Sequence, residues 1–136
     1  MPRTRSRITL WDRDFGRGHN GADALSNVED AAAGRASRRS GGSSTFLDDQ
    51  LVSAMVALAD DQGFDYFVTC ITGAFHSANS LHYAGRPFEV DGVRINGPSA
   101  KSDAFAAACR RLGAIEVIGP VVGVDNGHWD HIHCGF

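Results

Sequence analysis

The last ten residues of the chain form the stretch that decides how its fold closes. They read Gly127-His128-Trp129-Asp130-His131-Ile132-His133-Cys134-Gly135-Phe136. Because strand side chains alternate, His131 and His133 project from one face of the C-terminal strand that we expect over residues 131–136. Asp130 and His128 then lie where the chain bends out of a preceding turn. Neutral imidazole is the commonest side-chain metal ligand, so this stretch predicts half of a metal site.

A second stretch, which can supply the remaining ligands, reads Ser80-Leu81-His82-Tyr83-Ala84-Gly85-Arg86-Pro87-Phe88-Glu89-Val90-Asp91. Glycine and proline interrupt its middle, so we place His82 on a loop and the last four residues on a strand. Alternation puts Phe88 and Val90 on the core face of that strand. Glu89 and Asp91 share the other face, where two adjacent carboxylates need water, a cation or a raised pKa. A metal beside His82 satisfies that need.

Together the two stretches predict a metal site with three protein ligands. These ligands are His82, one of Glu89 or Asp91, and His133. The fourth position is then left for water, which is the arrangement of a catalytic rather than a structural zinc site. Asp130, set beside the metal without binding it, can act as a general base toward water.

The size of the chain and its charge distribution bound the number of domains. A length of 136 residues indicates one domain that can bury a hydrophobic core without the help of disulfides or a structural metal. Residues 1–45 hold eight arginines against five acids, whereas residues 46–136 hold five basic residues against eleven acids. We therefore expect residues 1–45 to form a basic N-terminal arm or irregular extension, and residues 46–136 to form the folded domain. The arm either binds an anionic polymer or stays a solvated tail.

The expected helices and strands of the domain do not alternate regularly. A first helix, capped by Thr45 or Asp48, stops at Gly63, and a second covers residues 98–112. Residues 65–72 are rich in β-branched and aromatic side chains and predict a buried strand. Short turns join several of the later strands. This order favours an α+β fold in which helices flank a small, mainly antiparallel sheet.

The two motifs, in this order, resemble those of a known family. The pattern Ser-x-His-x-x-Gly-x-x-x-Glu, followed by a C-terminal His-x-Asp-His-x-His, is similar to the zinc D-Ala-D-Ala carboxypeptidases and L-alanyl-D-glutamate endopeptidases of bacteria and phages. The resemblance covers residues 46–136 and implies the hedgehog/DD-peptidase fold. It implies His82, Glu89 and His133 as zinc ligands and Asp130 as the general base. His128 and His131 match positions that support catalysis.

The activity that the resemblance implies is that of a zinc metallopeptidase, which makes the chain an enzyme. It would hydrolyse a peptide bond in bacterial peptidoglycan stem peptides, as an endolysin or a wall-editing enzyme, with water at the zinc activated by Asp130. The alternative is a non-catalytic, zinc-containing peptidoglycan-binding module of the same fold. A third possibility is a metal-dependent hydrolase of a substrate outside the wall, such as a dipeptide.

The sequence departs from the family pattern at two places. The second ligand is usually aspartate, and here Glu89 stands in its position. The family also carries an arginine upstream of the first histidine, and residues 71–77 contain none. His76 or Arg86 could take the role of that arginine. Ser80 and Trp129 are further candidates for binding substrate.

The expected compartment follows from what the chain lacks. No apolar run approaches the roughly 18 residues of a membrane span, and no signal peptide is visible. We therefore expect the chain to be made in the cytoplasm. We also expect it to be a monomer. It would act on the cell wall after lysis or non-Sec export, or as part of a phage particle. Its expected partner is a peptidoglycan stem peptide, and neither a membrane nor a nucleic acid.

The three cysteines lack the spacing of a disulfide framework or of a cysteine-rich zinc site. One pair could form in an oxidising compartment. Cys70 and Cys134 both lie in strand-like runs and are the pair that we expect. Free buried thiols, including Cys109, are the alternative.

Overall fold

The computed structural model describes residues 7–13, 21–39, 44–73, 85–90, 97–121, 123 and 127–136. Its helices and strands follow one another in a mixed order. They are β1 (Ile8–Leu10), α1 (Ala24–Ala32), β2 (Ser37–Arg38), β3 (Ser44–Thr45), α2 (Asp49–Asp60), β4 (Tyr66–Cys70), β5 (Pro87–Val90), α3 (Ala100–Arg111), β6 (Glu116–Ile118) and β7 (Ile132–Gly135). The fold of the described residues is therefore α+β, as the sequence predicts.

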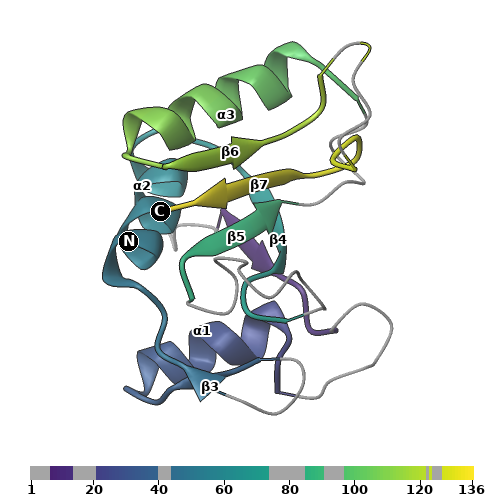
Figure 1. The fold of residues 1–136 in the computed structure, drawn as a ribbon. Coiled ribbons are helices and arrows are strands. Elements are labelled where there is room, and N and C mark those ends of the chain that lie inside the picture. The colour runs from purple at the N-terminus through teal and green to yellow at the C-terminus, as the bar shows by residue number, and fades with distance from the viewer. Residues whose placement is uncertain are drawn as a thin grey trace.

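A five-stranded sheet forms the centre of the molecule, in the order β1-β4-β5-β7-β6 (Figure 1). Strand β1 runs parallel to β4, and the other three pairings are antiparallel. The expectation of a mainly antiparallel sheet is confirmed. The C-terminal strand β7 lies between β5 and β6, so residues from three separate parts of the sequence meet there. Strands β2 and β3 form a separate two-stranded sheet.

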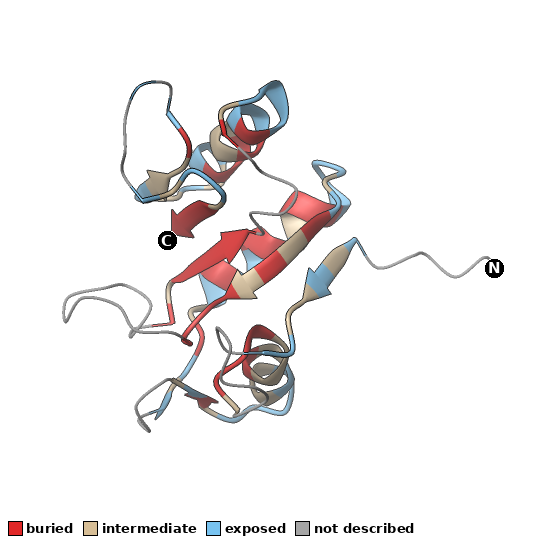
Figure 2. Cartoon of the chain, turned by 90° about the vertical axis from the view of Figure 1, so that its right-hand side faces the viewer, coloured by how far each residue is buried: buried red, intermediate tan, exposed pale blue. Residues whose placement is uncertain are grey.

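One face of the sheet carries the hydrophobic core. Phe88 and Val90 of β5 are buried in it, as alternation predicts, and they pair with Cys134 and Ile132 of β7. Helices α2 and α3 supply apolar side chains to the same core cluster. The burial runs through the central strands and the inward sides of the helices (Figure 2). The opposite face of β5 and β7 is left for polar side chains.

Both helices that were expected in the domain form, and their caps explain their limits. Asp48 caps α2 and accepts a hydrogen bond from the Gln50 amide at 2.9 Å. Ser99 caps α3 through a reciprocal pair of hydrogen bonds with Ser102. At its other end α3 stops before Gly113, whose φ of +99° is a conformation that glycine adopts readily. The predicted limits therefore differ from the observed ones by only a few residues.

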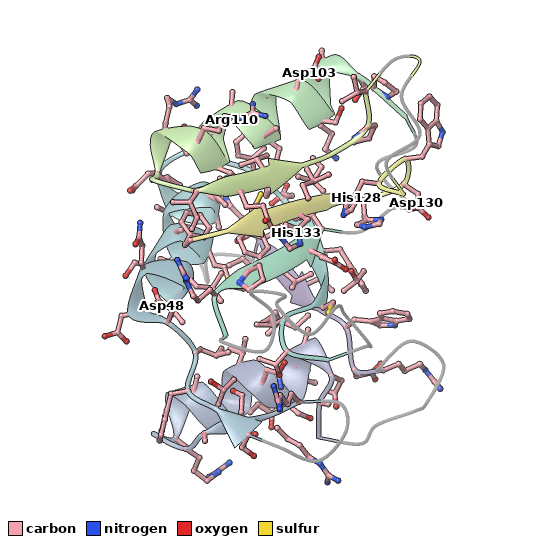
Figure 3. The ribbon with its side chains drawn as sticks, viewed as in Figure 1. Asp48, Asp103, Arg110, His128, Asp130 and His133 are labelled. Carbon is pink, nitrogen blue, oxygen red and sulfur yellow. The ribbon has the colours of Figure 1, made fainter. Side chains whose placement is uncertain are left out.

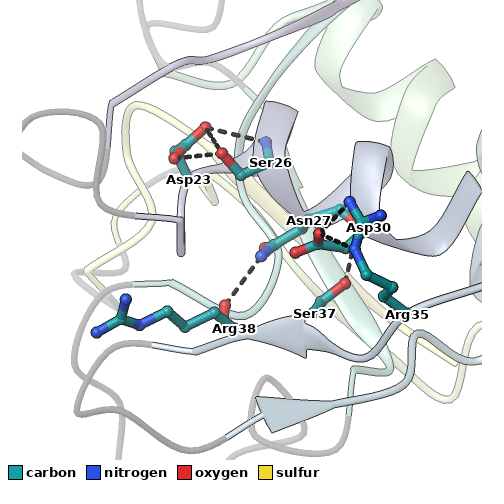
Figure 4. A network of polar contacts seen from close by, with 7 residues as sticks. All are labelled: Asp23, Ser26, Asn27, Asp30, Arg35, Ser37 and Arg38. Atoms are coloured by element: carbon teal, nitrogen blue, oxygen red, sulfur yellow. Dashed lines mark hydrogen bonds and ion pairs between the residues drawn. The ribbon is translucent and has the colours of Figure 1, made fainter. Parts of the chain in front are cut away.

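The N-terminal third of the chain contributes to the same sheet. Strand β1 forms its edge, and α1 packs beside β4 with Asn27 fully buried. The Asn27 carboxamide accepts from the Thr72 amide at 3.1 Å and donates to the Arg38 carbonyl at 3.0 Å. Figure 4 shows the bond from Asn27 to the Arg38 carbonyl among the polar contacts around α1. The separate folding of residues 46–136 stays a prediction, which a truncation described in the Discussion tests.

The three cysteines are buried free thiols, which was the alternative that the sequence left open. The expected pairing of Cys70 with Cys134 is wrong. The Cys134 thiol points into the core and lies 2.7 Å from the Cys109 thiol of α3. The Cys70 thiol instead donates to the Gly73 carbonyl. Both residues do lie in strands, but strand membership alone does not decide which face a thiol occupies.

In the part of the chain that the structure describes, no helix combines the length and the apolar character that crossing a membrane requires.

Candidate metal centre

The polar face of the sheet brings a carboxylate and an imidazole together across two strands. Glu89 of β5 lies directly opposite His133 of β7 in the antiparallel register. Residues directly opposite each other share a face. Their side chains approach to 3.6 Å between Glu89 Oε1 and His133 Nδ1. Both residues are buried, so their charges are shielded from water and interact strongly.

A second carboxylate reaches the other side of the same imidazole. Glu116 of β6 lies on the face that holds His133, because Ile118, two residues later, is the register partner of His133. Glu116 Oε1 lies 2.5 Å from His133 Nε2. An ionised carboxylate only accepts hydrogen bonds, so the Nε2 atom carries a proton that it donates to Glu116.

The charge state of His133 reflects both neighbours. Burial, the largest single influence, lowers the pKa of His133, because it penalises the charged imidazolium. Hydrogen bonding and charge from Glu89, together with those from Glu116, act the other way and outweigh burial. The pKa of His133 is therefore raised above its ordinary value. A cation at this place is favoured, whether it is a proton or a metal ion.

Two further histidines complete a group of donors beside Glu89. One ligand atom each of Glu89, His128 and His131 lie within 4.8 Å of one another, so the three could hold a metal ion. The His128 and His131 rings are 4.5 Å apart, and those of His128 and His133 are 6.1 Å apart. Figure 3 shows His133 on β7 and His128 in the turn before that strand. A single turn thus places several imidazoles next to a buried carboxylate.

Asp130 lies in the same turn, at the solvent edge of this group. Its side chain is 72% exposed, and its Oδ1 atom lies 2.8 Å from His131 Nδ1. This contact occupies one ring nitrogen of His131, so Nε2 is the ring nitrogen that could bind a metal. The position agrees with a carboxylate that stands beside a metal without coordinating it.

The structure places the predicted site residues as follows. Glu89 belongs to the group that can hold a metal, and His133 lies next to it. His128 and His131, predicted as supporting residues, supply the two imidazoles of that group. The ligand set of His82, Glu89 and His133 stays a prediction. Four further predicted candidates lie outside the described residues: His76, Ser80, His82 and Asp91.

Two candidates for substrate binding are described and have structural contacts. The Arg86 guanidinium donates from Nε to the Phe136 carbonyl, which ties the start of β5 to the C-terminus. Trp129 is 52% exposed, and its ring lies against Gly97, whose amide donates to the Trp129 carbonyl at 2.8 Å. Gly97 has a φ of +83°, and a Cβ atom there would come within 2.7 Å of the Trp129 ring. The substrate-binding roles of Arg86 and Trp129 stay predictions.

Glu116 is a residue that sequence reasoning missed. It lies in a short, mostly apolar run, and neither of the two motifs includes it. Its contact with His133 depends on the register between β6 and β7, which local sequence does not specify. The sequence offered one indication of its place: Glu116 and Ile118 are two positions apart and so share a strand face.

Two imidazoles and a carboxylate are donor types of catalytic zinc sites, and a nearby free carboxylate is a typical proton acceptor. No family model, curated protein or solved structure matches the chain.

Proposed function

We propose that the chain is a zinc metallopeptidase that hydrolyses a peptide bond in bacterial peptidoglycan stem peptides. The observation that carries the proposal is the group of Glu89, His128 and His131 beside the buried pair of Glu89 and His133. This group coincides with the two motifs that resemble the zinc D-Ala-D-Ala carboxypeptidases and L-alanyl-D-glutamate endopeptidases. With the activity we propose the hedgehog/DD-peptidase fold of that family.

The donor set fits zinc by its chemistry. Imidazole nitrogens with one carboxylate are the ligands that zinc takes in many hydrolases, whereas calcium and magnesium prefer oxygen alone. The proposed ligands are Glu89 and His133 from the described residues and His82 from the other motif. When bound, zinc supplies a Lewis acid that polarises a carbonyl group and makes a neighbouring water more acidic.

A carboxylate next to His133 fixes the orientation of that imidazole. Glu116 accepts the Nε2 proton of His133 and so turns the Nδ1 atom of that ring toward Glu89. Such a carboxylate partner fixes the tautomer and the orientation of a metal-binding histidine and raises its basicity. Glu116 is therefore a positioning residue for His133 in this proposal.

Asp130 is the proposed general base. Its carboxylate stands at the exposed edge of the donor group, where it can take a proton from water that attacks the scissile carbonyl. The contact between Asp130 and His131 holds the carboxylate there. His128 and His131, as hydrogen-bond donors, would stabilise the negative charge that develops on the carbonyl oxygen.

The alternative function is a non-catalytic module that holds zinc and binds stem peptide. The high exposure of the Asp130 side chain favours it, because a carboxylate open to solvent is less well enclosed for proton transfer than one shielded beside a substrate. The exposed Trp129 ring beside the same turn offers a surface for binding peptide. The place of action that we propose for either function is the cell wall, reached after lysis, by non-Sec export or within a phage particle.

Zinc content and muropeptide release from purified sacculi distinguish the two functions. For the enzyme, we expect the purified chain to carry zinc and to release muropeptides. Asp130→Asn should abolish release and keep the zinc, whereas Asp61→Asn, at an exposed carboxylate after α2, should change neither. Zinc without release by the unmodified chain would favour the module. A chain that binds no zinc would contradict both.

A further inference from the structure

Two thiols meet in the core, at the contact between α3 and β7. The Sγ atoms of Cys109 and Cys134 are 2.7 Å apart, and neither side chain is exposed to solvent. The thiol of the third cysteine, Cys70, instead donates to the Gly73 carbonyl at 3.1 Å.

Regular structure holds the two thiols in place. Cys109 lies in the last turn of α3, on the buried face that also carries Phe105 and Ala108. Cys134 lies in β7, where it pairs with Phe88 on one side and with Val117 on the other. Because a helix and a central strand fix both Cα positions, the approach of the sulfurs does not depend on a mobile loop.

We propose that Cys109 and Cys134 form an intramolecular disulfide when the chain folds in the presence of an oxidising disulfide such as oxidised glutathione. The thiolate of one cysteine attacks the glutathione disulfide, forms a mixed disulfide and releases one glutathione thiolate. The thiolate of the second cysteine then attacks the protein sulfur of that mixed disulfide and releases the second glutathione. Two electrons pass to the oxidant, and the two thiol protons pass to the released glutathione.

The burial of the pair decides when the bond forms. Both thiols are fully buried in the folded chain. An oxidant in solution therefore has no access to the pair there. The disulfide therefore forms while the chain folds or after local opening, and only slowly in the intact native state.

The disulfide would close a ring of the chain that includes the turn of the polar site. The two cysteines are 25 positions apart in the sequence, and β6 and the turn with His128 and Asp130 lie between them. Closing this ring restricts the unfolded chain and so stabilises the folded one. The proposal does not rest on the metallopeptidase function, since it follows from the contact of the sulfurs alone.

The test is refolding of the full chain from denaturant with oxidised glutathione. We expect the number of reactive thiols to fall from three to one, the mass to drop by that of two hydrogen atoms, and the Tm to rise. Peptide mapping without reductant should give one cross-link, between Cys109 and Cys134. Cys70→Ser should preserve the change, and Cys109→Ala should prevent it.

Peptide mapping of the oxidised, unmodified chain tests the proposal even if Cys109→Ala fails to fold. Three free thiols after oxidative refolding, or a cross-link that includes Cys70, would overturn the proposal. Oxidation of the native chain should be at least about tenfold slower than during refolding, because access requires opening. Equal rates would overturn the link between folding and bond formation.

Discussion

Glu89 and His133 face each other across two central strands, with 3.6 Å between Glu89 Oε1 and His133 Nδ1. Burying an imidazole with a carboxylate at each ring nitrogen costs desolvation free energy. Such an arrangement is weak evidence that it serves stability alone. Each of the two carboxylates attracts a cation, and Glu89 does so next to two further imidazoles. We propose that this arrangement forms one half of a metal site, and the first two predictions test that role.

Removing His133 should lower zinc content and thermal stability together. Zinc bound only to the folded state adds about 3 kcal/mol of stability at a hundredfold excess over its Kd. In His133→Ala and Glu89→Ala we therefore expect less zinc by mass spectrometry and a smaller rise of Tm on adding zinc. Unchanged zinc stoichiometry in both variants would contradict their assignment as ligands. A loss confined to His128→Ala and His131→Ala would move the assignment to those residues.

Glu116→Gln should weaken zinc binding without abolishing it. The variant keeps the size of the side chain but removes the charge that holds the Nε2 proton of His133. Loss of such a partner typically costs about 10- to 100-fold in metal affinity. The Kd for zinc, measured by competition with a chelating dye, checks this. Glu29→Gln, at an exposed carboxylate of α1, is the matched control and should leave the Kd unchanged. An equal Kd in both variants would contradict the role of Glu116.

Stability should fall at alkaline pH through Tyr66. Burial raises the pKa of its phenol above the ordinary value near 10, and its hydroxyl donates to the Met55 carbonyl at 2.6 Å. A raised folded-state pKa means that the contribution is complete below about pH 10 and is lost as the pH rises further.

The free energy of unfolding in urea, measured between about pH 8 and 11, checks this. Tyr66→Phe should be less stable by about 1 kcal/mol at the lower pH, because the Met55 carbonyl loses its donor. Its stability should then decline less steeply with pH than that of the unmodified chain. Parallel curves would show that Tyr66 does not titrate on unfolding.

The N-terminal third should be needed for stability. Asn27→Ala leaves the buried amide of Thr72 without its acceptor and should cost about 2 kcal/mol. Gln62→Ala removes an exposed surface amide whose oxygen accepts a hydrogen bond from Arg111, and should cost less than about 0.5 kcal/mol. Urea unfolding compares the two.

Deleting residues 1–44 tests the same relationship at the level of a segment. The truncation removes β1 from the sheet edge and α1 from beside β4. Because these contacts are lost, we expect an insoluble or much less stable chain, contrary to the separate folding that the sequence predicts. A truncated chain that unfolds cooperatively at the Tm of the full chain would support the predicted boundary at residue 45.

Local sequence was enough to predict the elements that are set by periodicity and caps. Asp48 and Gly63 delimit α2, and the alternation around Glu89 correctly separated core from polar side chains. Each motif contributes to the group that could hold a metal: Glu89 comes from one, and His128 and His131 come from the other. These features depend on a few neighbouring residues, so they can be inferred without a fold.

Features that depend on long-range pairing could not be predicted. The contact of Glu116 with His133 needs the register of β6 on β7, and the contact of Cys109 with Cys134 needs the packing of α3. The place of β1 beside β4 joins segments more than fifty residues apart. No local pattern encodes such a choice, because many partners would satisfy the same alternation.

The approach of Gly97 to Trp129 has a consequence for the tolerance of the chain to change. Gly97 carries no functional group, yet any side chain there would collide with the Trp129 ring, and its positive φ already disfavours one. The indole belongs to the same turn as His128 and Asp130, so a displaced ring would shift both. Random mutagenesis should therefore find position 97 almost as intolerant as the histidines themselves, although it offers no atom to a metal or a substrate.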